Sequence, residues 1–272
     1  MSPGRLPVTV LAPLAARYGV DRSGILRVEI PPEPDGVVRA MPVVLRLERP
    51  PAIRTPSLSS VGPEGLSAAR RRCDTGSLAS PLRTSVLEAA ARAALALCLD
   101  PRAEPDGEWH EDVATWVDAR IRKIARRARG AHWAAVQELP GVTVVVGDAQ
   151  ARALLPGPVD DVPKVVSRLQ IGGTDLPDDQ PGPPPPGVPV IWVNGALSMT
   201  VGKAAAQVGH ASMLDAAARG LTAVPPYAVR TAAPAAWARL CDAADRGEAV
   251  AVRDAGFTEV APGTITTITT PG

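Results

Sequence analysis

The chain has 272 residues, a formal net charge of +1, 46% hydrophobic residues and 21% charged residues, an ordinary composition for a soluble globular protein. Because the net charge is near zero, only a local basic patch can indicate a nucleic-acid partner. Cys73, Cys98 and Cys241 form no CxxC pair, which argues against a structural zinc site and a disulfide framework. No run reaches the ~18 apolar residues of a membrane helix. The N-terminal segment does not resemble a signal peptide, so we expect a soluble, cytoplasmic protein.

Two stretches interrupt the sequence. Residues 50–83 are rich in Ser, Pro, Gly and Arg without sustained periodicity, which predicts a flexible insertion or long loop. Residues 178–189 contain four consecutive prolines, which favour an extended spacer. We therefore predict an N-terminal accessory domain over 1–177, a linker over 178–189 and a second domain over 190–272.

The N-terminal part predicts a small α/β layer whose topology the pattern leaves open. Its predicted elements are a strand at Val43–Glu48, helices at Ser85–Leu99 and Asp112–Arg129, a hairpin of Val142–Val146 with Ala151–Leu155, and a short helix at Val162–Leu169. The second helix is expected because apolar residues recur at helical spacing, namely Val113, Trp116, Val117, Ile121, Ile124 and Ala128.

The C-terminal part has clearer start and stop signals. Its predicted elements are a strand at Val190–Val193, a helix at Val201–Arg219 ended by Gly220, a strand at Tyr227–Thr231, a helix at Pro234–Asp245, a strand at Glu248–Arg253 and a last strand within Gly263–Thr270. This β-α-β-α-β-β order implies a mixed sheet with helices packed on it. The predicted fold class is therefore α/β, with a smaller α/β domain preceding the C-terminal one.

The first chemistry-bearing segment is Met199–Ala211. On a helix, Lys203, Gln207 and His210 occupy positions i, i+4 and i+7 and share one face. Lys203 lies in the first turn, where the helix dipole disfavours a cation unless an anion or a developing oxyanion is shared with it. The alternative is an exposed lysine with a Gln and a His satisfied by nearby backbone. A Walker A loop is not indicated, because Leu197 stands where its first glycine would be.

The second segment is Arg253–Thr266. Asp254 follows an apolar strand, and the carboxyl ends of strands are favoured ligand positions in α/β sheets. Asp254 and Thr258 bracket a turn that Gly256 permits. The alternative is that both residues only cap this turn.

Together the two segments, GKAAAQVGHA and DAGFTEVAPGTIT, resemble the signature blocks of type 2 peptidyl-tRNA hydrolases, in the same order. The resemblance covers the chain from Val190 onward. It implies a four-stranded mixed sheet flanked by helices and hydrolysis of the peptidyl-tRNA ester without metal or cofactor. It assigns the catalytic group to Lys203, Asp254 and Thr258. The supporting residues would be Gln207, His210, Gly256, Thr264 and Thr266. By analogy, a homodimer is possible.

The chain departs from this family near the site. Asn194, Ala196 and Val201 stand where the family has an arginine, an aspartate and a lysine, and Phe257 stands where an arginine is frequent. Fewer cations should weaken phosphate contacts. Either tRNA is held elsewhere on the protein or the substrate differs.

A basic segment at Ala119–Gly130 is the candidate for holding tRNA elsewhere. It is predicted to be helical and contains no acid. Its predicted tRNA-binding residues are Arg122, Lys123, Arg126, Arg127 and Arg129. The alternative is a solvated helix face neutralised by Glu108, Glu111 and Asp112.

Three functions remain open on the sequence. The first is hydrolysis of peptidyl-tRNA, and the second is transfer of the acyl group from the same tRNA ester to an amine. The third is a tRNA-binding module without catalysis. All three name tRNA as the partner and none involves a membrane.

Overall fold

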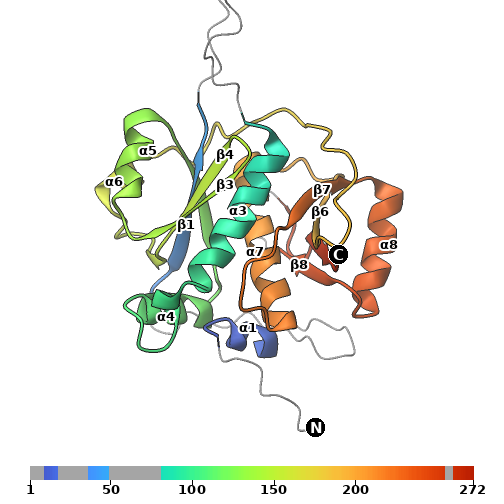
Figure 1. Ribbon diagram of the computed structural model, residues 1–272, viewed down its shortest axis with the longest axis horizontal. Coiled ribbons are helices and arrows are strands. Elements are labelled where there is room, and N and C mark those ends of the chain that lie inside the picture. Colours follow the sequence, from blue (N-terminus) through green and yellow to red (C-terminus); the bar gives the residue numbers. More distant parts are fainter. Residues whose placement is uncertain (1–8, 18–35, 49–80, 255–259) are drawn as a thin grey trace, which may run out of the picture.

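The computed structural model describes residues 9–17, 36–48, 81–254 and 260–272. The predicted insertion at 50–83 lies outside the described residues except for its last three positions. The chain forms two mixed β-sheets with helices between them and on their outer faces (Figure 1). The predicted α/β class and the C-terminal four-stranded mixed sheet are confirmed.

The N-terminal sheet has the strand order β2-β1-β4-β3, with β5 pairing to the start of β1. Its strands are β1 (Arg39–Arg46), β2 (Lys123–Ala128), β3 (Gly141–Val146), β4 (Ala149–Leu154) and β5 (Gly157–Pro158). β1 and β2 are parallel, while β4 is antiparallel to both β1 and β3. A parallel pair needs a crossover connection, and α3 (Arg83–Cys98) and α4 (His110–Asp118) lie in it.

The C-terminal sheet has the strand order β7-β6-β9-β8. Its strands are β6 (Val190–Asn194), β7 (Ala228–Ala232), β8 (Val250–Arg253) and β9 (Ile265–Thr270). β6 and β7 are parallel, and β9 is antiparallel to both β6 and β8. The crossover helix is α7 (Val201–Arg219), and α8 (Pro234–Asp245) connects β7 to β8.

The two sheets have the same topology. Each begins with a parallel pair joined through a long helix, continues through an outer helix, α5 (Gly130–Gln137) or α8, and ends in an antiparallel pair, so that the strands lie in the order second, first, fourth, third. Even the bond that closes each parallel pair is repeated, since the Leu47 amide donates to Ala128 and the Gly195 amide to Ala232. The chain is therefore built from two repeats of one β-α-β-α-β-β unit.

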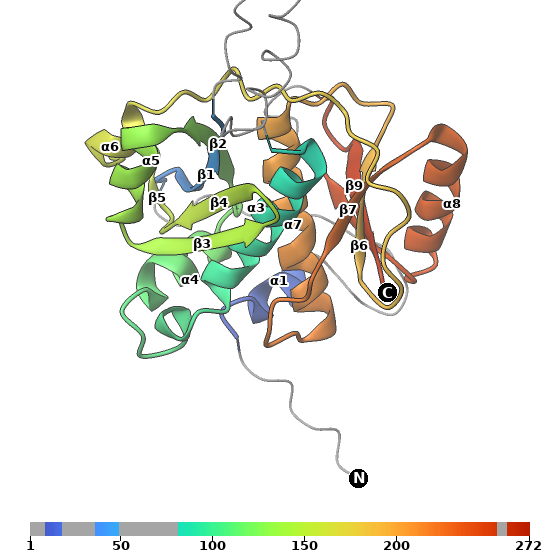
Figure 2. The ribbon, with the colours of Figure 1, turned by 45° about the horizontal axis from the view of Figure 1, so that its top comes forward.

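The long helices α3 and α7 pack against each other between the two sheets, with α5 and α8 on opposite outer faces (Figure 2). Their contacts match across the repeats: Ser212 Oγ donates to Ala91 O, and Ala94 Cβ lies where a Cβ on Gly209 would approach within 3.2 Å. At the beginning of both helices, Arg83 donates to Met199 O. Alanine and glycine at this interface let two backbones approach closely, which suits a chain with few aromatic residues.

One large apolar core extends across both repeats, and two smaller cores lie under the outer helices. The large core joins α3 and α7 to both sheets, and it also holds the short helix α1 (Ala12–Arg17) through Leu11 and Leu14. The smaller cores lie beneath α5 and α6 (Lys164–Ser167) and beneath α8. No helix among the described residues has the length and apolar character needed to cross a bilayer.

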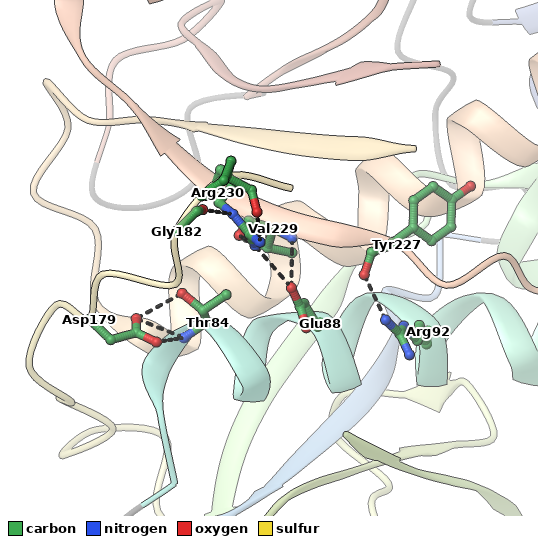
Figure 3. A network of polar contacts seen from close by, with 9 residues as sticks. Thr84, Glu88, Arg92, Asp179, Gly182, Tyr227, Val229 and Arg230 are labelled. Atoms are coloured by element: carbon green, nitrogen blue, oxygen red, sulfur yellow. Dashed lines mark hydrogen bonds and ion pairs between the residues drawn. The ribbon is translucent and has the colours of Figure 1, made fainter. Parts of the chain in front are cut away.

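The proline-rich segment has no regular secondary structure and is bound to the body of the molecule (Figure 3). Asp179 accepts from the amide and hydroxyl of Thr84 at the start of α3. Arg230 of β7 donates to Gly182 O and Pro183 O and pairs with Glu88 of α3 at 3.2 Å. The boundary at 178–189 stays a prediction, but the segment is attached to both repeats.

Most predicted elements are confirmed with small changes of boundary, including α3, the β3–β4 hairpin, α6 and the C-terminal series. The helix predicted over Asp112–Arg129 is wrong in its second half. α4 ends at Asp118, the chain turns at Ile121 with φ of 48°, and β2 begins at Lys123. The unpaired edge of β1 decides this, because β2 fills it with a full row of parallel hydrogen bonds, and such tertiary pairing overrides helical spacing.

Candidate active site

The predicted site lies at one edge of the C-terminal sheet. β6, β7 and β8 run in the same direction, and α7 starts near the carboxyl end of β6. The first turn of α7 is held by two hydroxyls: Thr200 Oγ1 accepts from the Lys203 amide, and Thr174 Oγ1 accepts from the Gly202 amide. Lys203 is therefore fixed at the positive end of a 19-residue helix.

Asp254 is placed directly after β8. Its amide donates to Thr264 O at 2.9 Å, and its carbonyl accepts from the Gly263 amide at 2.7 Å. These bonds close the connection between β8 and β9 and direct Asp254 toward α7. Thr264, which the sequence predicts as a supporting residue, contributes here through its backbone.

Lys203 and Asp254 form an ion pair in which Lys203 Nζ donates to Asp254 Oδ2 at 2.5 Å. The two side chains are 8% and 6% exposed, so the pair is almost removed from solvent. Gln207 Nε2, one turn further along α7, donates to the same oxygen at 2.8 Å. Because both donors converge on one carboxylate oxygen, the structure brings the two halves of the predicted site together.

Thr266 at the start of β9 orients Gln207. Its hydroxyl donates to Gln207 Oε1 at 2.6 Å, and both residues are buried. With its oxygen held by Thr266, the amide can only present its NH₂ group to Asp254. The chain Thr266–Gln207–Asp254–Lys203 is thus a directed network, and the supporting roles of Gln207 and Thr266 in a reaction stay predictions.

His210, the other predicted supporting residue on α7, contacts the N-terminal repeat. His210 Nδ1 lies 3.2 Å from Lys123 Nζ of β2. Burial lowers the pKa of His210, and the charges of Lys123 and Lys203 lower it further. Burial also lowers the pKa of Lys123 to about 7. His210 is therefore a neutral residue at the interface between the repeats.

Two predicted site residues, Gly256 and Thr258, lie outside the described residues, as does Phe257. Their catalytic and supporting roles stay predictions.

The predicted tRNA-binding residues do not share a solvent-facing helix stripe, because they lie on and beside β2. Lys123 and Arg126 are each only 9% exposed, and Arg126 donates to Leu169 O. They are held inside the protein, so their assignment to an exposed phosphate-binding helix face is wrong. Arg122 and Arg127 are partly buried, and Arg129 is exposed.

Arg127 and Arg129 line a surface pocket of about 250 Å³. Its other lining residues are Leu47, Ala128, His132, Arg168, Leu169 and Gln170. Sequence reasoning missed His132 and Arg168, since neither belongs to a motif and Arg168 comes beside Arg127 only through the backbone bridge between Arg127 and Gln170. We call this site the arginine pocket.

The described residues of the N-terminal repeat hold no second copy of the network. The contact of Ser212 with Ala91 matches that of Ala94 with Gly209 when α3 and α7 are exchanged, so Ala91 is equivalent to Gly209 and Ala94 to Ser212. The same alignment makes Ser85 equivalent to Lys203 and Ala89 to Gln207. The long β8–β9 connection is replaced by the tight turn at Gly147 and Asp148. Within the part of the chain that the structure describes, this network therefore belongs to the C-terminal repeat alone.

Among the described residues, no group of three or more His, Cys, Asp and Glu side chains is placed to hold a metal ion. Comparison with models of known protein families found no match, and searches of the curated proteins and of the solved structures each returned no significant match.

Proposed function

We propose that the protein hydrolyses the ester that joins a peptide, or an N-blocked amino acid, to the ribose of tRNA. The observation that carries the proposal is the buried ion pair of Lys203 and Asp254 at the beginning of α7. The resemblance of the two segments that supply these residues to type 2 peptidyl-tRNA hydrolases supports it. A tRNA substrate assigns the activity to the cytoplasm.

In this reaction Asp254 takes a proton from a water molecule as the water oxygen attacks the ester carbonyl carbon. The Lys203 ammonium, at the positive end of α7, stabilises the oxyanion of the tetrahedral intermediate. When the intermediate collapses, the bond to the ribose oxygen breaks and that oxygen takes the proton back from Asp254. Gln207 keeps Asp254 in place throughout. Water and the ester are the only reactants used, and the side chains return to their starting state.

The chemistry is suited to a site of low exposure. An ammonium group stabilises an oxyanion more strongly where water is excluded, because the local dielectric is lower. The directed network from Thr266 to Asp254 keeps the carboxylate oriented without reorganisation during the reaction.

Incubation of the full chain with a labelled peptidyl-tRNA tests the proposal. We expect free peptide and intact tRNA, with kcat reduced by about 10²–10³-fold in Lys203→Met and Asp254→Asn. Asp242→Asn, on the exposed face of α8, is the matched control and should retain activity. Release of the peptide as a conjugate with an added amine would instead identify a transferase. Binding of tRNA without any release would leave a tRNA-binding module, and either result would overturn the proposal.

A further inference from the structure

The arginine pocket lies at the carboxyl ends of the parallel strands of the N-terminal repeat. Leu47 follows β1, and Ala128 and Arg129 stand at the end of β2. In open α/β sheets, ligands bind at this edge because the strands end there and the following helices begin there. The equivalent residues after β7, Ala232, Ala233 and Pro234, carry no charge, so the pocket is a feature of one repeat only.

The charge of the pocket selects an anion. Three arginines and a histidine line it, and none of the described lining residues is acidic. Glu48, the acid nearest in sequence to Leu47, is already paired with Arg46 at 3.0 Å. Guanidinium groups match phosphate oxygens in geometry and keep their charge at every physiological pH.

The backbone at the pocket adds to this preference. Arg129 is the N-cap residue of α5, and no side chain caps that helix. The positive end of α5 therefore lies at the part of the pocket that Arg129 and His132 line, where it favours a bound anion. Leu47, Ala128 and Leu169 provide an apolar floor against which a ribose or a base can pack.

The pocket is connected to the catalytic network by a short piece of chain. Arg127 donates through Nε to Gln170 Oε1 at 2.9 Å, and its guanidinium lies against Gly173, where a Cβ would be 3.2 Å from Cζ. The next residue, Thr174, accepts from the Gly202 amide beside Lys203. In Figure 2 this yellow segment after α6 runs along the side of the molecule where α3 and α7 begin. Four residues of chain span at most ~14 Å, so Gln170 at the pocket and Thr174 beside the start of α7 lie close together.

We propose that the arginine pocket binds a phosphodiester group of the RNA whose ester is cleaved at Lys203 and Asp254. This inference rests on the proposed function for the identity of the RNA. It explains how the chain holds tRNA although Asn194, Ala196 and Val201 replace charged residues next to the site. The N-terminal repeat then contributes substrate binding in place of a second catalytic network.

The test compares two double variants that change the net charge equally. Arg129→Ala/Arg168→Ala removes two exposed arginines from the pocket, while Arg239→Ala/Arg246→Ala removes two exposed arginines on and after α8, on the opposite side of the molecule (Figure 2). Binding of labelled deacylated tRNA is measured at increasing salt. The pocket variant should lose about tenfold in affinity, and its slope of log K against log salt should be shallower by about 1.5, the value for two lost contacts. The control should keep the wild-type slope.

Competition with inorganic phosphate separates RNA phosphate from a small phosphorylated ligand. Inorganic phosphate should compete with tRNA in the wild type and in the α8 control, and it should compete less in the pocket variant. Equal slopes in both variants would overturn the proposal. Competition by inorganic phosphate without any effect of the pocket variant on tRNA affinity would also overturn it, and would assign the pocket to a small phosphorylated ligand.

Peptide release tests the proposed hydrolase function separately from the binding measurements. If the wild-type chain releases no peptide but the pocket variant binds tRNA more weakly than the wild type, the pocket proposal stands and the hydrolase proposal fails. If the wild-type chain hydrolyses the ester and the pocket variant has the same KM, the hydrolase proposal stands and the pocket proposal fails.

Discussion

Lys203 of α7 and Asp254 after β8 form a buried ion pair at 2.5 Å, although 51 residues separate them in sequence. Breaking a buried pair leaves an uncompensated charge, so Lys203→Met and Asp254→Leu should each lower the free energy of unfolding by about 3–5 kcal/mol. The double variant Lys203→Met/Asp254→Leu leaves no buried charge. Its loss in free energy of unfolding should be smaller than the sum of the two single losses by at least ~1 kcal/mol. Urea unfolding of the four proteins measures this, and strict additivity would show that the pair is not coupled.

Thr266→Val should lower kcat for peptidyl-tRNA by about fivefold, because it removes the hydrogen bond that orients Gln207, worth about 1 kcal/mol. KM should change little, since Thr266 acts through Gln207 and Asp254. Thr269→Val is the matched control: Thr269 lies on the same strand, is equally buried, and its hydroxyl has no hydrogen-bond partner among the described residues. Thr266→Ser, which keeps the hydroxyl, should recover activity. Equal losses in Thr266→Val and Thr269→Val would indicate a packing effect alone.

Gln207→Glu tests the same network through pH. A second carboxylate beside Asp254 disfavours the charged form of that residue, so the acidic limb of the kcat profile should move to higher pH. Gln207→Leu removes the donor without adding charge and is the comparison for lost positioning. If the pH profile of kcat in Gln207→Glu coincides with that of the wild type, residue 207 does not influence the carboxylate that takes part in the reaction.

The buried Lys123 makes stability depend on pH. Its pKa is lowered to about 7 in the folded protein from an unfolded value of 10.5, so between these values only the unfolded chain carries the proton. The free energy of unfolding should therefore rise with pH in this window, by up to about 1.4 kcal/mol per pH unit. Urea unfolding between pH 7.5 and 9 isolates the effect, because the lowered pKa of His210 acts below this range and the raised pKa of Cys98, about 12, acts above it.

Lys123→Met should abolish that rise, whereas Lys164→Met, an exposed lysine of α6, should retain it. Methionine fills the same space over Gly209 without an amine. A wild-type chain whose stability is flat from pH 7.5 to 9 would show that Lys123 keeps its proton when buried.

Asp179 should stabilise α3 as a capping carboxylate supplied from the proline-rich segment. Asp179→Ala removes the acceptor for the Thr84 amide and hydroxyl and should cost about 1 kcal/mol, the usual loss for a helix cap. Hydrogen exchange in the first turn of α3 should become faster. Asp175→Ala, at an exposed position of the same segment, is the control. Equal exchange in both variants would mean that the segment does not hold the helix.

The elements of the C-terminal repeat follow from local chemistry. α7 begins at Val201 and ends at Arg219 as predicted, because Thr200 caps its start and Gly220 adopts the left-handed conformation (φ of 63°) that ends it. The two motif segments pointed to Lys203, Gln207 and Asp254 through their resemblance to type 2 peptidyl-tRNA hydrolases. Their convergence needed the sheet, since no local rule directs the end of β8 toward the start of α7.

The N-terminal repeat shows what local pattern misses. Ala119–Gly130 has strong helix formers and a continuing apolar stripe, and yet it forms β2, because β1 offers it a row of backbone partners. The same pairing buries Lys123 and Arg126 and leaves Arg127 and Arg129 beside Arg168. The duplication of the fold is also invisible in the sequence, where α3 and α7 share few residues.

The sequence by itself therefore determined the helices and turns of the C-terminal repeat and singled out Lys203, Gln207 and Asp254, since capping, glycine conformation and side-chain spacing act over a few residues. Only the tertiary structure decided that Lys203 meets Asp254, that Lys123 meets His210, and that three arginines gather at one sheet edge. The reason is that backbone hydrogen bonding between strands and burial of the α3–α7 interface join segments far apart in the chain, and their free energy exceeds local preference.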